Sequence, residues 1–467
     1  MDDVGLSKNN SRWVFGAFLA GLILRLLNLG GKSLWFDEAH AYYVANAGAE
    51  AFWVRGLDSF HPPLFFHLLQ IWSNFGQEEA FLRILPALLA SIGTIPIFII
   101  GRRIFNSGVG LTAALLFALN PLVMWYSQEL RMYAQFITFG LLSTACLATF
   151  ISTENNRLKI WSALFFVMST IGILYSHYLS MLFVYAQLLL LLVVWGFGRA
   201  SLKQVGLWAL GVAISVGFYW PWINSVPGNR FYTRLLSGDS VSYFSPLVSQ
   251  FSDNIGLIRL VGAVLIVVAV AALVQIRWLR EMAEKILSAN WFKVGLFVFF
   301  VLFLAISVYP RGYTIKRHVL IYVPFLLIIV GIIWPVSTKN FAAVGLLCAA
   351  SLVASLWNIY LIPKTEWEQI NNQITADVQA YDTVLINPGH MGFAFDYYNE
   401  EQSLLITQRG DELRDALAQV VEVEGRVWYV AQPTDQNHRP AVTDALNEFL
   451  DSSSCTDFTK VQLCLYE

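Results

Sequence analysis

The sequence has few charged residues for its length. Only 13% of its 467 residues are Asp, Glu, Lys or Arg, whereas 57% are hydrophobic. A soluble domain carries about 25% charged residues, so the composition predicts a polytopic membrane protein. The net charge of −2 indicates no acidic or basic partner by itself, and we expect no nucleic-acid partner.

Cysteine is also scarce, and the four cysteines form no CxxC pair. Cys146 and Cys348 lie in apolar runs, where we expect them to be packing residues. Cys455 and Cys464 lie near the end of the chain. Whether they form a disulfide is left open, because a disulfide requires that this segment face an oxidising compartment.

Several motifs that define large enzyme classes are absent. The "GGKS" at residues 30–33 resembles the end of a phosphate-binding loop, but Leu26 stands where that loop needs a glycine, and no strand precedes it. No GxGxxG follows a predicted strand, and neither HExxH nor GxSxG is present. The sequence therefore indicates no nucleotide site of a known kind.

Long apolar stretches are abundant. A membrane span takes about 20 apolar residues, and the chain has eleven candidates. They lie near residues 12–30, 82–100, 108–126, 133–152, 160–176, 178–197, 205–223, 256–276, 293–309, 318–334 and 341–361. The first is long for a signal peptide and no A-x-A site follows it, so we expect it to stay as a span.

Short basic loops predict the orientation in the membrane. Loops such as "GRRIF" and "NNRLK" fall on one side, which the positive-inside rule makes cytoplasmic. The N-terminus joins them, and an odd number of spans places the C-terminal segment outside. We therefore expect a multi-pass protein of the plasma (inner) membrane with a cytoplasmic N-terminus.

The C-terminal segment has a different composition. Residues 363–467 contain six basic and 18 acidic residues, whereas the rest of the chain contains 24 basic and 14 acidic residues. Helices predicted over "TEWEQINNQITADVQAY", "DELRDALAQVVEV" (411–423) and "AVTDALNEFLDSS" alternate there with short strands. The strands are predicted over "DTVLIN", "SLLIT", "GRVWYVAQ" and "FTKVQLCLYE", and the pattern is typical of an α/β layer domain. We predict a transmembrane domain over 1–362 and a soluble acidic α/β domain over 363–467.

The first outside loop, residues 31–81, is long and carries the pair Asp37 and Glu38. The "DEAHAYYVANAG" in it predicts an amphipathic helix with Asp37 in its first turn. Pro62 and Pro63 predict the start of a second helix. Carboxylates close to lipid are costly and usually functional, which makes this pair a candidate site.

More charged residues fall on the same side. Glu129 lies in "WYSQELRMY" at the outer end of the third predicted span, close to Arg131. An interfacial salt bridge of Glu129 with Arg131 or Arg83 is the alternative to a catalytic role. Three cations cluster between two spans in "YPRGYTIKRH". These cations are Arg311, Lys316 and Arg317.

Two histidines and two tyrosines belong to the same outside group. We expect His61, Tyr133, His177 and Tyr178 to contact the substrate. The histidines and the acids together are also residue types that ligate metals, so a divalent metal is possible. Their spacing is not that of a known metal motif, and packed or hydrogen-bonded histidines are the alternative.

A membrane enzyme without a nucleotide site can use these groups on a lipid-linked phospho-sugar. Its leaving group is a phosphate, so the second carboxylate that glycosidases use as a general acid is not required. One carboxylate takes the proton of an acceptor hydroxyl, and cations stabilise the departing phosphate. The acids and cations therefore favour sugar transfer from a polyprenyl-phosphate donor to an acceptor lipid, glycan or protein outside the cytoplasm.

The same segments carry a family resemblance. The motifs "SLWFDEA", "HPPLF", "LNPLVMWYSQELRMYA", "LYSHYLSML" and "KRHVLIYVPFLLI" resemble the GT-C membrane glycosyltransferases. Within that class they are similar to the family 39 type, the bacterial relatives of the protein O-mannosyltransferases and of the lipid A aminoarabinose transferase. The likeness extends to about residue 334. It implies a polytopic α-helical GT-C fold of about 11 transmembrane helices.

The resemblance also implies roles for particular residues and inversion at the anomeric carbon. The catalytic base of that family matches Asp37, its second acid matches Glu38, and the acid of its second outside loop matches Glu129. Its lipid-phosphate contacts fall on basic residues of the outside loops. Here these are Arg131, Arg311, Lys316 and Arg317. The extra luminal module of the eukaryotic protein mannosyltransferases is absent, so the acceptor stays open.

Two other functions fit a polytopic chain. A transporter or flippase usually has charges and broken helices at the membrane midplane and internal repeats, whereas the charges here gather at the outer ends of spans. A structural subunit that binds a partner through its acidic domain is the third alternative. Activity lost on a single change of Asp37, with assembly intact, would distinguish an enzyme from such a subunit.

Overall fold

The computed structural model describes most of the chain. Its described residues are 8–47, 61–196, 198, 200–225, 300, 320–379, 382–387, 391–399, 405–407, 426–432, 439–448, 450 and 452–467. The chain divides into two compact units. The first contains Met1–Leu27, Ala47–Trp72 and Arg83–Leu361, and the second contains Asn28–Asn46, Ser73–Leu82 and Ile362–Glu467. Two parts of the first loop thus belong to the same unit as the C-terminal segment, and the predicted boundary at residue 362 stays a prediction.

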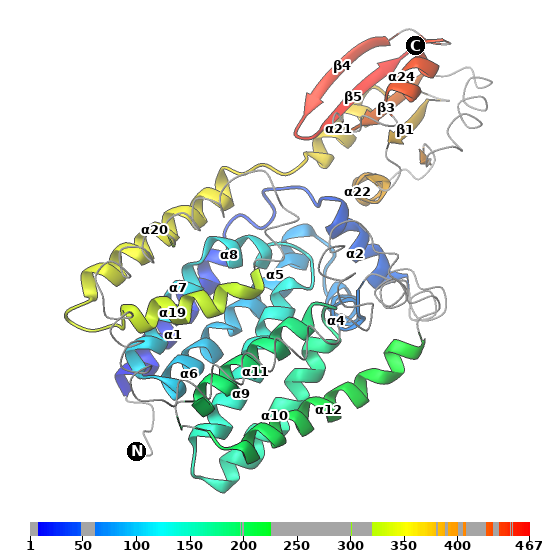
Figure 1. Cartoon of the computed structure of the whole chain (residues 1–467). Coiled ribbons are helices and arrows are strands. Elements are labelled where there is room, and N and C mark those ends of the chain that lie inside the picture. Colours follow the sequence, from blue (N-terminus) through cyan, green and yellow to red (C-terminus); the bar gives the residue numbers. More distant parts are fainter. Residues whose placement is uncertain are drawn as a thin grey trace. The chain divides into compact units, whose positions relative to one another are not determined.

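The described part of the first unit is helical (Figure 1). Its helices are α1 (Lys8–Leu26), α4 (Leu64–Ser73), α5 (Glu79–Ile92), α6 (Thr94–Ile104), α7 (Ser107–Leu119), α8 (Pro121–Ser127), α9 (Tyr133–Ser152), α10 (Asn156–Leu174), α11 (Ser180–Gly196), α12 (Leu202–Ser225), the 3₁₀ turn η1 (Leu320–Tyr322), α19 (Val323–Ile333) and α20 (Phe341–Tyr360). The last residue of α4 and the first turn of α5 are assigned to the second unit. Nine of the predicted spans coincide with these helices. The span predicted at 256–276 lies outside the described residues, and so does the span predicted at 293–309 except for Phe300, so the count of eleven stays a prediction.

Five of the described helices are long and apolar enough to cross a membrane, or six if the bent pair α7–α8 counts as one span. The bend of 52° falls at Asn120, directly before Pro121. A residue before proline avoids the helical conformation, and Asn120 is extended (φ −67°, ψ 126°). Its side chain accepts hydrogen bonds from the backbone N–H groups of Leu122 and Val123, which starts α8 in a new direction.

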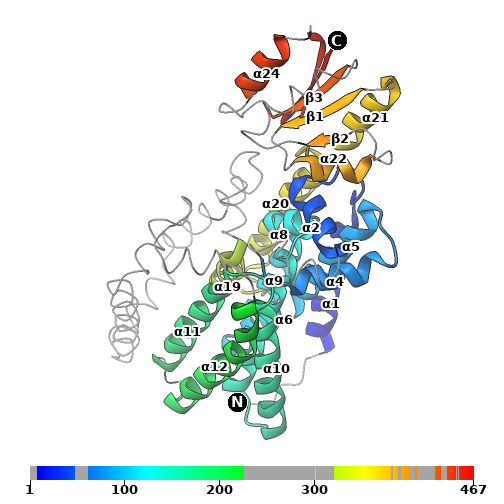
Figure 2. The same cartoon turned by 90° about the vertical axis from the view of Figure 1, so that its right-hand side faces the viewer.

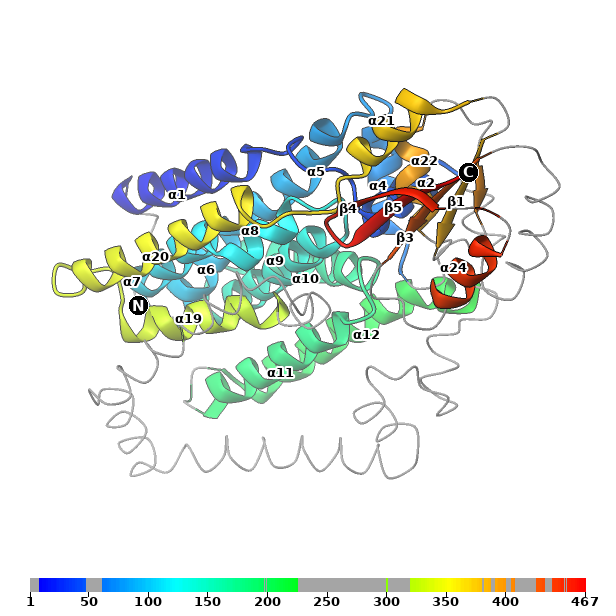
Figure 3. The ribbon, with the colours of Figure 1, turned by 90° about the horizontal axis from the view of Figure 1, so that it is seen from above.

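Helix α7 packs closely against α1, α6 and α19. Glycines make the closest approach: a Cβ added at Gly101 of α6 would lie 2.7 Å from the Cα of Gly110 in α7. A Cβ at Gly110 would lie 2.5 Å from the carbonyl oxygen of Phe98. Small residues at such crossings are typical of helix packing in membranes. Figure 3 shows α20 running along α8, another packed pair of this unit.

Buried polar side chains connect α9, α10, α11 and α12. Gln187 of α11 donates to Ser143 and Thr144 of α9, and Ser143 contacts Thr170 of α10. The indole of Trp208 in α12 donates to Gln187. Because lipid offers no hydrogen-bond partner, such networks hold helices together in one arrangement.

The second unit contains a five-stranded mixed sheet. Its strands are β1 (Thr383–Asn387), β2 (Leu405–Thr407), β3 (Val427–Ala431), β4 (Ser452–Phe458) and β5 (Val461–Tyr466), in the order β2-β1-β3-β5-β4. Strand β1 is parallel to β2 and β3, whereas β5 is antiparallel to β3 and β4. The helices of this unit are α2 (Phe36–Asn46), α21 (Trp367–Asp377), α22 (Gly392–Tyr398) and α24 (Arg439–Asn447). The predicted small C-terminal α/β fold is confirmed.

Helices cover both faces of this sheet (Figure 2). Val384 and Ile386 of β1 share a core with Trp367 of α21 on one face. Leu385, which lies between them, packs with Val442 of α24 on the other face. The continuous apolar runs of β1 and β3 follow from burial on both faces.

Some predicted boundaries of this unit were wrong. The helix predicted over "AVTDALNEFLDSS" ends at Asn447, and β4 begins at Ser452, because Ser452–Phe458 pairs with β5. The single strand predicted over "FTKVQLCLYE" is divided by a turn whose Lys460 has a positive φ of 65°. Helix α22 was not predicted, and the helix predicted in 411–423 lies outside the described residues. Cys455 and Cys464 face each other across β4 and β5 and form a disulfide.

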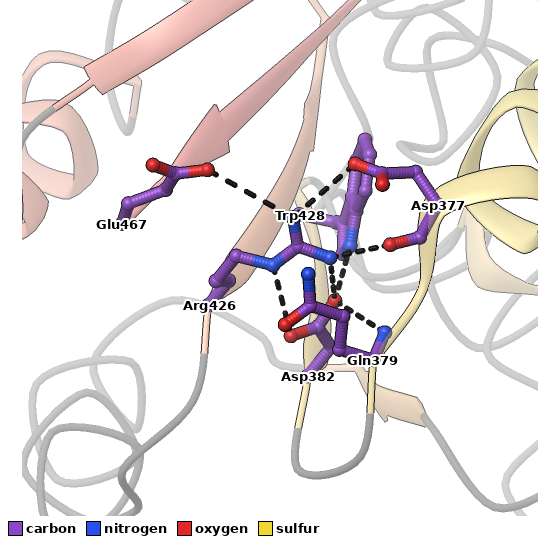
Figure 4. Close-up of polar contacts among 6 residues, drawn as sticks. All are labelled: Asp377, Gln379, Asp382, Arg426, Trp428 and Glu467. Carbon is purple, nitrogen blue, oxygen red and sulfur yellow. Dashed lines mark hydrogen bonds and ion pairs between the residues drawn. The ribbon is translucent and has the colours of Figure 1, made fainter.

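An ionic cluster connects the ends of α21, β1 and β3 (Figure 4). Arg426 donates to Asp382 at 2.9 Å and to Asp377 at 3.2 Å. Asp382 also accepts from the backbone N–H of Gln379 and from the indole of Trp428. Burial works against ionisation, but these hydrogen bonds and the charge of Arg426 hold the pKa of Asp382 below its ordinary value. The cluster therefore stabilises the unit while Asp382 is ionised.

Candidate active site

The segment between α8 and α9 carries Glu129 and Arg131. Both side chains are buried, with 2% and 3% of their surfaces exposed. The side chain of Gln128 donates to the carbonyl oxygens of Arg25 and Leu27. The last carbonyls of a helix have no partner within it, so Gln128 satisfies the end of α1 and holds this segment in place.

Arg25 makes a similar connection between α1 and α7. Its guanidinium is fully buried and donates to the carbonyl oxygens of Phe117 and Ala118. These carbonyls lie in the last turn of α7, where a cation also interacts favourably with the helix dipole. Arg25 therefore has a structural partner and needs no role in substrate binding.

Arg131 contacts His61. The Nη2 atom of Arg131 lies 3.3 Å from Nε2 of His61. A guanidinium has only donors, so Nε2 of His61 accepts this hydrogen bond. With Nε2 as the acceptor, a neutral ring carries its proton on Nδ1.

His177 lies in the turn between α10 and α11 beside His61, with ring centroids 5.7 Å apart. Its Nδ1 accepts a hydrogen bond from the backbone N–H of Leu179 at 3.0 Å. In the neutral ring the proton is therefore on Nε2, which makes Nε2 a donor suited to a sugar or phosphate oxygen. The backbone N–H of Leu64 donates to the carbonyl of Tyr175, which brings the start of α4 to this turn.

Aromatic rings surround this pair of histidines. Tyr133 and Phe136 of α9 lie 5.9 and 5.3 Å from the ring of His177. Tyr126 stacks edge-on against Tyr133 at 5.0 Å. The first unit thus brings together four of the predicted site residues. They are His61, Arg131, Tyr133 and His177.

The other predicted site residues of the first unit are Tyr178, Glu129 and the three cations in residues 311–317. Tyr178 is buried directly after His177. Glu129 is close in sequence to Arg131, whose backbone N–H donates to its carbonyl at 2.7 Å. Arg311, Lys316 and Arg317 lie outside the described residues. Within the described ranges, no group of three or more His, Cys, Asp and Glu side chains is placed to hold a metal ion.

The second unit carries Asp37 and Glu38 in the first turn of α2. Asp37 is partly exposed, whereas Glu38 is fully buried. One oxygen of Glu38 accepts from Nζ of Lys364 at 2.9 Å and from the backbone N–H of Trp35 at 3.4 Å. The two adjacent acids therefore have different environments, and Glu38 is a structural anchor of the helix start.

Helix α2 packs against α22 through aromatic side chains. The ring of Phe393 lies 5.1 Å from His40 and 5.8 Å from Tyr43. Burial raises the pKa of Tyr43 to about 12, with smaller contributions from Asp396 and Tyr42. Burial also raises the pKa of Asp396. This contact fixes the face of α2 that is turned to the C-terminal segment.

Sequence reasoning did not find Lys364 or Gln128. Lys364 follows the last apolar helix in a stretch with no motif, and 326 residues separate it from Glu38. Gln128 is inside the "SQEL" segment, but an amide gives no signal of the backbone groups it will meet. Only the fold brings these partners together.

Known proteins share this fold. A family model described as dolichyl-phosphate-mannose-protein mannosyltransferase matches residues 60–223. Comparison with curated protein sequences gave no match. ArnT from Cupriavidus metallidurans in the apo state is 13% identical, with a TM-score of 0.53 and 98% of both chains covered. The same protein bound to undecaprenyl phosphate is 14% identical, with a TM-score of 0.53 and coverage of 97% of this chain and 98% of that chain.

An archaeal protein is similar to the same degree. The oligosaccharyltransferase AglB from Archaeoglobus fulgidus, in complex with an inhibitory peptide and a dolichol-phosphate, is 11% identical. Its TM-score is 0.54, and the match covers 97% of this chain and 74% of that chain. These neighbours are polytopic GT-C membrane proteins. This chain is a multi-pass membrane protein with the GT-C glycosyltransferase fold, which confirms the resemblance found in its motifs.

Proposed function

We propose that the chain is an inverting glycosyltransferase that moves a sugar from a polyprenyl-phosphate donor to an acceptor hydroxyl outside the cytoplasm. The observation that carries the proposal is the buried Arg131, hydrogen-bonded to His61 and close to His177, within a GT-C fold. Two proteins of this fold have been solved with undecaprenyl phosphate or dolichol-phosphate bound. A buried cation with hydrogen-bond donors beside it suits the phosphate of such a donor.

In this reaction the acceptor oxygen attacks the anomeric carbon, and the bond from that carbon to the phosphate oxygen breaks. Polyprenyl phosphate leaves with the electron pair, and Asp37 takes the proton of the acceptor hydroxyl. Arg131 stabilises the phosphate, together with Arg311, Lys316 and Arg317. Glu129 is a further acid of the site. His61, Tyr133, His177 and Tyr178 contact the donor or the acceptor.

The orientation is part of the proposal: the N-terminus is cytoplasmic and the C-terminal unit lies outside the plasma membrane. The disulfide between Cys455 and Cys464 supports it, since disulfides persist in oxidising compartments. The acceptor, which is a lipid, a glycan or a protein, meets the donor at that outer surface.

A direct assay tests the function. Purified protein in nanodiscs is incubated with a panel of radiolabelled polyprenyl-phosphate sugars and membrane extracts, and the labelled product is identified. Transfer of label to an acceptor with release of polyprenyl phosphate supports a glycosyltransferase. Movement of labelled lipid between leaflets without any transfer supports the flippase alternative instead.

A further inference from the structure

The ion pair between Lys364 and Glu38 is buried and joins distant parts of the second unit. The side chain of Glu38 has no exposed surface, and that of Lys364 is 9% exposed. A charge out of water needs a partner of opposite sign, so each of these side chains fixes the other. The remaining ion pairs described for this unit centre on Arg426, at the sheet.

Glu38 also forms part of the start of α2. The oxygen that meets Lys364 accepts from the N–H of Trp35, three residues earlier. The N–H groups of Glu38 and Ala39 both donate to the carbonyl of Trp35. The carboxylate of Glu38 therefore accepts a hydrogen bond from the backbone at the start of α2, beside Asp37. Lys364 holds that carboxylate in place.

Apolar contacts hold the same turn on the C-terminal segment. Leu34 and Ala39 are fully buried in a core with Trp367 and Ile370 of α21. The N–H of Leu34 donates to the hydroxyl of Tyr398 at 2.6 Å. The hydrophobic contacts give burial without direction, whereas the Leu34–Tyr398 hydrogen bond and the Lys364–Glu38 pair are directional and together fix the rotation of the turn.

We propose that Lys364 is a positioning residue for the catalytic carboxylate of Asp37 and acts through Glu38. The inference rests on the proposed function, because it takes Asp37 as the general base. A base must be held within a fraction of an ångström of its productive position. The C-terminal unit is thus part of the catalytic apparatus: it supplies the cation that keeps the helix start of the first loop in register.

Four variants test this role. Lys364→Met removes the cation, and Lys364→Arg retains it. The double variant Glu38→Gln with Lys364→Met removes both charges of the pair, so no buried charge is left without a partner. If Lys364→Met alone does not fold, the double variant provides the measurement instead. Lys159→Met is the matched control, because Lys159 pairs with the exposed Glu154 at 3.5 Å.

The readouts are kcat, the donor dissociation constant, and amide hydrogen exchange of residues 35–39. We expect Lys364→Met to lower kcat by about 10- to 100-fold while the donor constant changes by less than about twofold. Exchange of the α2 start rises, Lys364→Arg restores most of the kcat, and the double variant is no worse than the single one. Lys159→Met behaves like the parent.

The proposal is overturned if kcat and exchange in both Lys364→Met and the double variant equal those of Lys159→Met. It is also overturned if the loss falls on donor binding and arginine does not restore it. A parent protein that transfers no sugar would instead refute the proposed function. The exchange experiment needs no activity, so the two failures are distinguishable.

Discussion

Arg131 donates a hydrogen bond from Nη2 to Nε2 of His61 across 3.3 Å. Because a guanidinium has only donors, this contact gives the side chain of Arg131 a fixed direction. An arginine in this state is prepared for a phosphate, which it contacts more strongly than a neutral donor does.

Replacement of Arg131 should therefore weaken donor binding. We expect Arg131→Gln to raise the donor dissociation constant by about 10- to 100-fold, because a hydrogen bond to a charged group contributes roughly 1.5–3 kcal/mol. The measurement is titration of the purified variant with a polyprenyl-phosphate sugar. Arg157→Gln, at an exposed arginine of α10, is the control. Equal constants for both variants would remove Arg131 from the site.

The close crossing of α6 and α7 gives a prediction on stability. Gly110→Ala places a Cβ 2.5 Å from the carbonyl oxygen of Phe98, and such overpacking costs about 1–3 kcal/mol. We expect a lower midpoint of thermal unfolding in detergent. Gly16→Ala in α1 meets no atom within 4 Å and should leave the midpoint unchanged. Equal unfolding midpoints for the two variants would contradict the close approach of α6 and α7.

The cluster around Asp382 predicts a dependence of stability on pH. The pKa of Asp382 is lower in the folded protein than its ordinary value, so its contribution is present above about pH 4. It is lost as the pH falls through the folded pKa. Hydrogen exchange of β1 and β3, corrected for intrinsic rates, should therefore rise in acid. Asp382→Asn should lose this pH dependence, and Asp444→Asn on the exposed side of α24 should keep it.

The proposed orientation predicts the behaviour of reporter fusions. A periplasmic phosphatase fused after Glu467 should be active, and a fluorescent protein that folds only in the cytoplasm should stay dark at the same position. Fusions in the loop after α9, near the basic residues Arg157 and Lys159, should show the reverse. A fluorescent fusion after Glu467 would place the C-terminal unit in the cytoplasm and contradict the proposed site.

Much of the fold was predictable, because hydrophobic length and periodicity determine where helices begin and end in a membrane protein. The break at "YSHYLS" was short, yet α10 ends at Leu174 and α11 starts at Ser180. The boundary between α24 and β4 was missed, since the serines before Cys455 favour a strand only through their pairing with β5. Helix α22 is short and is stabilised by contacts with α2 and α21, which a local pattern does not contain.

The site was predictable in its residue types and only partly in its geometry. The sequence distinguished Asp37 from Glu38 only through the family resemblance, whereas the structure separates them by burial and by Lys364. The contact of His61 with Arg131 joins residues 70 positions apart, which no local pattern contains. Long-range partners of this kind depend on the completed fold.

The central claim is that Asp37 is the general base of a sugar transfer. Asp37 lies in the first turn of α2, where the helix dipole favours a carboxylate. Asp37→Asn keeps the shape of the side chain and removes its basicity. Glu38→Gln and Glu129→Gln are the matched changes at the other two acids.

The most direct measurement is the initial rate of sugar transfer by Asp37→Asn in nanodiscs, with donor affinity determined on the same preparation. The account predicts a fall in turnover of about 10²–10⁴, the usual contribution of a general base, with donor affinity retained. Glu38→Gln should lower turnover less than Asp37→Asn does. A rate for Asp37→Asn equal to that of the parent would contradict the account, and it would move the role to Glu129 if only Glu129→Gln were inactive.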